Sequence, residues 1–195
     1  MKIVIVGCGR VGASVAEAYD REGHEIIIVD SSTAAFDRLP SSFGGTAIRG
    51  DGTDEDVLKR AGAEGADIFL SLTEGDNRNV MAAQLAAEEL GVPRVIAKIN
   101  DPLRAKAYAE LGIATVCRTG LMADSIDRYL GFPSSGLPGM LAPTGHHGAH
   151  HDRAARPATN AAGTLSPVGA GGSAGNGAPG ETPTANPGPT PSQEA

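Results

Sequence analysis

The stretch GCGRVG at residues 7–12 constrains the fold more than any other feature of this chain. It follows the apolar run at residues 3–6 directly and precedes a segment with helical spacing. In that context Gly7 allows a tight turn, Gly9 lets the backbone approach a pyrophosphate, and Gly12 lets the helix pack on its strand. The first backbone N–H groups of the helix then form an anion site. The stretch predicts a dinucleotide-binding unit of one strand and one helix.

An acidic residue is expected at the end of the second strand of such a unit, where it binds ribose hydroxyls. Asp30 stands at the end of EIIIVD, 18 residues after Gly12. Its carboxylate would repel a 2′-phosphate, so the sequence favours NAD(H) or an adenine nucleotide over NADP(H).

Arg10 lies between the glycines of this loop. Backbone amides already serve the pyrophosphate of a dinucleotide. A cation here therefore suggests contact with a further, terminal phosphate or with a partner, and a solvated arginine is the alternative.

Apolar, β-branched runs alternate with segments of helical spacing through the first 135 residues. The runs occupy residues 3–6, 26–29, 46–48, 67–72, 95–99 and 114–116. Their hydrophobicity is continuous rather than alternating, which is typical of parallel strands buried on both faces. We therefore expect an α/β, Rossmann-like fold with a doubly wound, parallel, six-stranded sheet.

Residues typical of helix ends support this alternation. Thr53 is predicted to cap a helix that ends at Gly62. Pro102 is predicted at the first position of another helix, which ends at Gly112.

The composition changes near residue 136, which predicts a domain at residues 1–135 and a tail at residues 136–195. The tail has 12 glycines and 9 prolines among 60 residues and no aromatic residue. It cannot bury enough apolar surface to offset an ordering entropy of about 1–2 kcal/mol per residue, so we expect disorder. The tail contains HHGAHH at residues 146–151. We interpret this as a solvated polar patch; weak capture of a transition metal is the alternative, and no metal site is predicted.

Charge and cysteine usage exclude several classes. The formal net charge of −7 offers no basic surface for nucleic acid. The chain shows no secretory signal and no apolar run long enough to span a bilayer, so Cys8 and Cys117 are interpreted as reduced cytosolic thiols.

Five stretches resemble the nucleotide-binding domain of the Trk/Ktr potassium uptake regulators, the RCK or KTN domain of the TrkA-N family. They are VIVGCGRVG, IIIVD, RGDGTDEDVLKRAG, ADIFLSLTEGDNRNVMAAQLA and VIAKINDP, and the likeness spans roughly residues 1–130. The resemblance implies binding of NAD(H) or ATP/ADP. It also implies a homo-oligomer, or a hetero-oligomer with a related regulator. Such an assembly docks at the inner face of the plasma membrane on a potassium-conducting membrane subunit and gates it.

The same resemblance implies a set of nucleotide-contacting residues: Gly7, Cys8, Gly9, Arg10, Val11, Gly12, Asp30, Asp51, Gly52, Thr73, Glu74 and Lys98. Residues 7–11 would hold the phosphates and Asp30 the ribose, with residues 51–52 facing the adenine. Residues 73–74 would approach the other end of the nucleotide, and Lys98 would lie beside its phosphates. Each also has a plainer interpretation, such as a turn residue at a strand end or a surface lysine.

The alternative function is an NAD-dependent oxidoreductase on a minimal Rossmann domain. The Tyr-x-x-x-Lys arrangement of short-chain dehydrogenases is absent, because Gly23, Gly112 and Pro133 stand four residues after the three tyrosines. We therefore expect a protein that is not an enzyme and has no catalytic residues.

The chain also departs from the family pattern. Trk/Ktr regulators follow this domain with a second, smaller α/β module, and here the Gly/Pro-rich segment stands instead. A single-module subunit that acts with a full-length companion is one interpretation.

Overall fold

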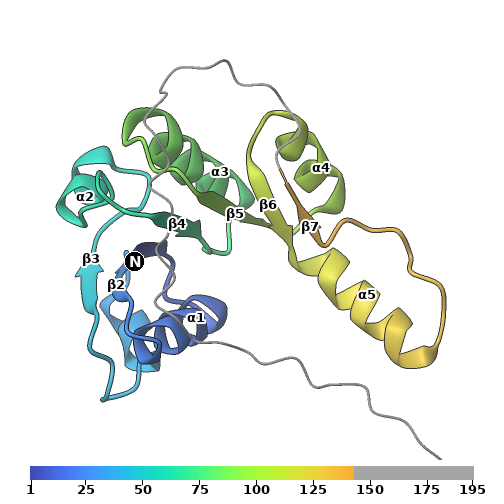
Figure 1. Cartoon of the computed structure of the whole chain (residues 1–195), viewed down its shortest axis with the longest axis horizontal. Coiled ribbons are helices and arrows are strands. Elements are labelled where there is room, and N and C mark those ends of the chain that lie inside the picture. The colour runs from blue at the N-terminus through green and yellow to red at the C-terminus, as the bar shows by residue number, and fades with distance from the viewer. Residues whose placement is uncertain (143–195) are drawn as a thin grey trace, which may run out of the picture. The chain divides into compact units, whose positions relative to one another are not determined.

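The computed structural model describes residues 1–142, which form an α/β fold around one seven-stranded sheet (Figure 1). The strands are β1 (Lys2–Val6), β2 (Glu25–Asp30), β3 (Thr46–Arg49), β4 (Ile68–Ser71), β5 (Val95–Ile99), β6 (Ala114–Cys117) and β7 (Met140–Leu141). Their order is β3-β2-β1-β4-β5-β6-β7, and the first six pair in parallel. The direction of winding reverses between β1 and β4, as in dinucleotide-binding Rossmann folds. The predicted fold class is confirmed.

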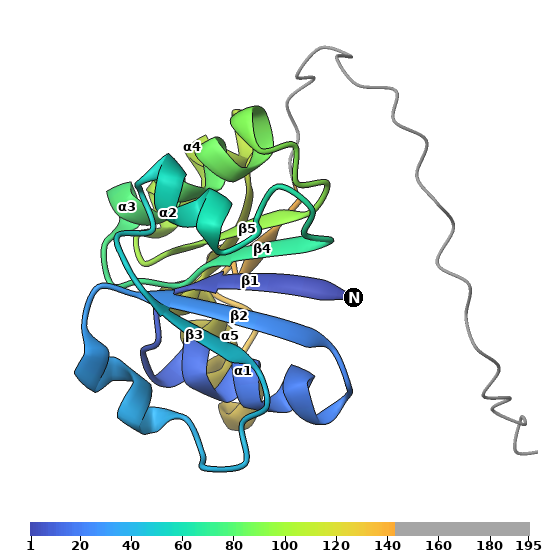
Figure 2. The same ribbon diagram turned by 90° about the vertical axis from the view of Figure 1, so that its left-hand side faces the viewer.

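Helices cover both faces of the sheet, with α2, α3 and α4 on one face and α1 on the other (Figure 2). The helices are α1 (Arg10–Arg21), α2 (Glu55–Arg60), α3 (Asp76–Gln84), α4 (Pro102–Glu110) and α5 (Arg118–Leu130). A 3₁₀-helix, η1 (Thr33–Arg38), follows β2, and a π-helical segment, η2 (Leu85–Glu89), continues α3.

The continuous apolar runs fill two cores because successive strand residues point to opposite faces. Val4 and Val29 pack with α2 and α3, while Ile3 and Ile28 pack with α1 on the other face. All four side chains are buried. This double burial holds the strand ends, and the loops after them, in fixed positions.

The predicted helix ends are confirmed at Pro102, which begins α4, and at Gly112, which follows its end with φ +91°. The prediction for Thr53 is wrong. Asp54 caps α2 instead, and its carboxylate accepts hydrogen bonds from the N–H groups of Asp56 and Val57. Aspartate is as good a capping residue as threonine, so the sequence was compatible with either Thr53 or Asp54 as the N-cap of α2.

The sheet has one strand more than the six expected, and it extends beyond residue 135. β7 pairs antiparallel with β6 through Thr115–Leu141 and Val116–Met140. A Cβ at Gly120 would collide with the Pro138 carbonyl, so glycine lets the returning chain cross the start of α5. Two strand residues in a Gly/Pro-rich stretch give no periodicity from which to predict such a strand. The predicted disorder beyond residue 142 and the histidines of residues 146–151 lie outside the described residues.

None of the helices within residues 1–142 combines the length and the hydrophobicity needed to cross a bilayer.

Candidate functional site

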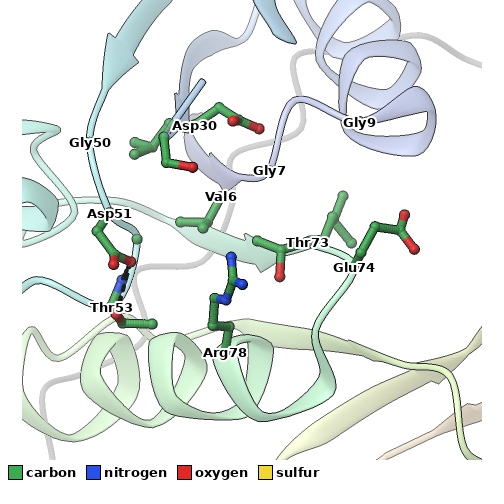
Figure 3. Close-up of a pocket in the computed structure, with 14 residues that line it drawn as sticks. Val6, Gly7, Gly9, Asp30, Gly50, Asp51, Thr53, Thr73, Glu74 and Arg78 are labelled. Carbon is green, nitrogen blue, oxygen red and sulfur yellow. Dashed lines mark hydrogen bonds between the residues drawn. The ribbon is translucent and has the colours of Figure 1, made fainter. Parts of the chain in front are cut away.

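A pocket of about 240 Å³ opens where the winding of the sheet reverses, at the carboxyl ends of β1 to β4 (Figure 3). Ligands of open α/β sheets bind at this place in the topology. The pocket is lined by Val6, Gly7, Gly9, Val29, Asp30, Ser31, Gly50, Asp51, Gly52, Thr53, Leu72, Thr73, Glu74 and Arg78. Seven of the residues predicted from the sequence therefore come together: Gly7, Gly9, Asp30, Asp51, Gly52, Thr73 and Glu74.

Glycine is needed at the three positions of the loop for different structural reasons. Gly7 has φ +102°, and a Cβ there would lie 2.9 Å from the Thr73 backbone nitrogen. A Cβ at Gly12 would collide with the Gly7 carbonyl, so α1 could no longer lie this close to β1. Gly9, by contrast, has no atom within 4 Å of its Cβ position. The space over Gly9 is open to a ligand, as a phosphate-binding loop requires.

The amino terminus of α1 begins at this open space. Gly9 is its N-cap residue, and no side chain caps the first N–H groups of the helix. Uncapped N–H groups and the positive end of the helix dipole favour an anion at this point.

Asp30 lies at the end of β2, half-buried at the pocket wall. Its Oδ2 accepts a hydrogen bond from the Cys8 N–H at 2.7 Å, and its Oδ1 accepts one from the Ser32 N–H at 2.9 Å. A carboxylate offers about four acceptor sites, so two remain for the hydroxyl groups of a ligand.

The loop after β3 forms another wall of the pocket. Asp51 Oδ1 accepts hydrogen bonds from the backbone N–H (2.9 Å) and the hydroxyl (2.8 Å) of Thr53. These two bonds hold the pKa of the Asp51 carboxyl below its ordinary value, with a smaller contribution from the Arg78 charge. Gly52 packs on Val6, where a Cβ would collide with the valine side chain. The local fold thus keeps Asp51 ionised at the pocket.

A buried asparagine joins the strand ends on the β4 side, and the sequence analysis missed it. Asn79 of α3 is completely buried. Its Oδ1 accepts from the Ser71 hydroxyl and from the N–H and hydroxyl of Thr73, while its Nδ2 donates to the carbonyls of Thr73 and Lys98. The helix carries two asparagines, the exposed Asn77 and the buried Asn79, and no spacing pattern in the sequence distinguishes them.

Lys98 does not line the pocket. Its side chain is buried, with Nζ 3.2 Å from Glu74 Oε1, and Arg118 approaches Glu74 Oε2 at 3.9 Å. Lys98 and Val11 instead line a neighbouring apolar groove beside α5. The interpretation of Lys98 as a snorkelling surface lysine is wrong, because its ammonium group is itself buried.

Three more predicted residues lie outside the pocket lining. The Cys8 side chain points into the core beside α1, and burial raises the pKa of its thiol, with Asp30 adding to the effect. Arg10, the first residue of α1, is exposed, and Gly12 is buried against Gly7. Cys8 reaches the pocket wall only through its backbone N–H.

The pocket also contains an arginine that the sequence analysis did not single out. Arg78 reaches it from the first turn of α3 (Figure 3). Within residues 1–142 no group of three or more His, Cys, Asp or Glu side chains is placed to hold a metal ion.

The parallel sheet wound in both directions, the glycine loop and the acidic residue ending β2 define an α/β protein of the Rossmann type. The TrkA-N domain family matches residues 3–119. This chain belongs to the TrkA-N family.

One relative and two solved structures are similar to this chain. The Trk system potassium uptake protein TrkA of Streptomyces coelicolor is 46% identical over 145 residues, which are 74% of this chain and 65% of that protein. This chain thus spans less than two thirds of that relative's length. The TrkA-N domain of the inner membrane protein ybaL from Escherichia coli matches with a TM-score of 0.60 at 19% identity, covering 66% of this chain and 96% of that domain. The AMP-bound form of the Shewanella denitrificans Kef CTD matches with a TM-score of 0.55 at 22% identity, covering 69% and 85%. At 19% and 22% identity, the likeness of these two structures to this chain shows a common fold alone.

Proposed function

We propose that this protein is a cytoplasmic, nucleotide-binding regulatory subunit of a Trk/Ktr-type potassium uptake system. It binds NAD(H) or ATP/ADP in the pocket at the carboxyl ends of β1 to β4. It works as a homo-oligomer, or with a related regulator, on the inner face of a separate potassium-conducting membrane subunit. The observation that carries the proposal is the pocket itself, in a chain of the TrkA-N family.

The residues around the pocket fit an adenine nucleotide. The uncapped start of α1 and the open space over Gly9 suit its phosphates. Asp30 retains acceptor sites for the ribose hydroxyls. The loop after β3 presents Asp51 and the close-packed Gly52 on the side left for the base.

Regulation of this kind requires the ligand to discriminate between two states of the assembly. A nucleotide that binds both states equally shifts nothing, however tightly it binds. A coupling of about 1–3 kcal/mol between nucleotide and membrane subunit corresponds to a change in affinity of roughly 5- to 150-fold. In this role the nucleotide is a signal: it is not chemically altered while it is bound.

Calorimetric titration of the purified protein with NADH, NAD, ATP and ADP tests the binding part of the proposal. We expect saturable binding of at least one of the four, and weaker binding in the Asp30→Ala variant. A folded protein that binds none of them would overturn the proposal.

Potassium uptake tests the regulatory part. Cells that depend on the membrane subunit and this protein should lose uptake when the protein is deleted and regain it with the wild type. The Asp30→Ala variant, expressed to the same level, should restore less potassium uptake than the wild type does. Nicotinamide oxidation measured with a panel of substrates separates the oxidoreductase alternative, which requires turnover.

A further inference from the structure

Arg78 is the residue of the pocket whose role neither the fold nor the packing explains. Its side chain is exposed and rises from α3 into the space between Asp51 and Thr73 (Figure 3). The guanidinium makes no hydrogen bond and no ion pair with any residue in the described part of the chain. A side chain with five donors in a fixed plane is thus left facing a ligand pocket.

The other charged residues that line the pocket are carboxylates with partners. Asp30 accepts from Cys8 and Ser32, and Asp51 accepts from Thr53. Glu74 pairs with Lys98 and Arg118, away from Arg78. Among the described lining residues, Arg78 is therefore the cation that remains available to a ligand.

Arg78 lies in the pocket between Asp51 and Thr73 (Figure 3). Its charge contributes to lowering the pKa of the Asp51 carboxyl, as expected for groups that face each other across a small space. Gly9, over which the phosphates would lie, is on the far side of Gly7 in Figure 3. In Figure 3 the guanidinium lies between Asp51 and Thr73, on the other side of Gly7 from Gly9 and the start of α1.

We propose that Arg78 binds the base of the nucleotide, with its planar guanidinium against the adenine ring while residues 51–53 face the edge of the base. The inference rests on the proposed function, because it takes the occupant of the pocket to be an adenine nucleotide. A guanidinium stacks on aromatic faces, and an ammonium cannot reproduce the planar contact. The contact is the same in every adenine ligand, whatever its number of phosphates.

Titration of Arg78 variants with adenosine, AMP, ADP and ATP tests this assignment. Arg78→Ala should weaken all four ligands by a similar factor, roughly 3- to 30-fold for a cation–π contact. Arg78→Lys, which keeps the charge, should recover little of the loss. Arg60→Ala, which removes an exposed arginine of α2 outside the pocket lining, is the matched control and should bind as the wild type does.

The same titrations separate the alternatives. A loss of affinity in Arg78→Ala that spares adenosine and grows with each added phosphate would overturn the inference and show that Arg78 contacts the phosphates. Unchanged affinity for all four ligands in Arg78→Ala would overturn it as well, while the proposed function would stand. A wild-type protein that binds no adenine ligand would overturn both. Within residues 1–142 Arg78 makes no hydrogen bond and no ion pair, so thermal unfolding of the variants should stay close to that of the wild type.

Discussion

The carboxylate of Asp30 accepts a hydrogen bond from the backbone N–H of Cys8 at 2.7 Å, which ties the end of β2 to the turn after β1. The residue placed to receive a ribose therefore also holds the loop placed to receive the phosphates. Ligand affinity and stability are coupled at this residue, and substitutions there affect both.

Asp30→Ala removes the acceptor for the Cys8 and Ser32 N–H groups as well as the ribose contact. We expect the free energy of unfolding to fall by about 1–3 kcal/mol, and nucleotide binding to weaken by about 1–3 kcal/mol. Asp30→Asn keeps one acceptor oxygen and should be intermediate in stability. Urea unfolding and calorimetry measure the two effects, and a folded Asp30→Ala protein with wild-type affinity would remove the ribose assignment.

Gly9→Ala and Gly12→Ala should separate binding from folding within one loop. The Cβ of Gly9→Ala enters open space, so the expected cost is that of a poorer helix cap, less than about 1 kcal/mol, while nucleotide affinity drops. The Cβ of Gly12→Ala collides with the Gly7 carbonyl, so this variant should be less stable by about 1–3 kcal/mol. Thermal melts of both variants, with and without nucleotide, make the comparison; equal melting temperatures would contradict it.

Asn79→Ala leaves several buried polar groups of β4, its following loop and β5 without partners. We expect a loss of about 2–5 kcal/mol in the free energy of unfolding, since each unsatisfied buried group costs about 1–3 kcal/mol. Asn77→Ala, on the exposed side of the same helix, should cost less than about 1 kcal/mol. Denaturant titration of the pair provides the test, and similar losses in both would show that the Asn79 bonds contribute little.

The pKa of Asp51 is lowered chiefly by the Thr53 N–H and then by the Thr53 hydroxyl. Thr53→Val removes the hydroxyl donor and keeps the N–H, so the pKa of Asp51 should rise part of the way toward its ordinary value of about 3.9. Because the folded pKa is lowered, this group's stabilising effect is present above the unfolded pKa and is lost as pH falls through the folded pKa. The carboxyl carbon chemical shift of Asp51, followed through an acid titration, measures the change; an unaltered midpoint would exclude a role for the hydroxyl.

Arg10→Ala tests the hypothesis that this exposed residue reads the phosphate count. We expect the ratio of ATP to ADP affinity to move toward one while adenosine binding is unchanged. In cells with the membrane subunit, potassium uptake should be blunted at equal protein abundance. Identical ATP/ADP ratios in wild type and variant would instead assign Arg10 to the structure or to a partner.

The sequence predicted the parallel strands and the glycine loop because both depend on local patterns: apolar runs, glycine spacing and an acid at a strand end. It could not predict Asn79 or Arg78 as parts of the site. Both residues lie in the stretch ADIFLSLTEGDNRNVMAAQLA, but their roles depend on which strand ends and helix starts meet in space, and no spacing rule assigns them. Lys98 illustrates the same limit, since its place at the end of β5 was predicted but its burial against Glu74 depends on tertiary packing.

The return of the chain as β7 has a consequence for aggregation. An uncovered strand exposes a row of N–H and C=O groups that another chain can pair with. β7 occupies part of that row on β6, with the Gly139 carbonyl accepting the Cys117 N–H at 2.6 Å. Residues 138–141 therefore shield one border of the sheet from strand addition by a neighbouring molecule, and the exposed residues of β3 leave the opposite border as the place where such addition would begin.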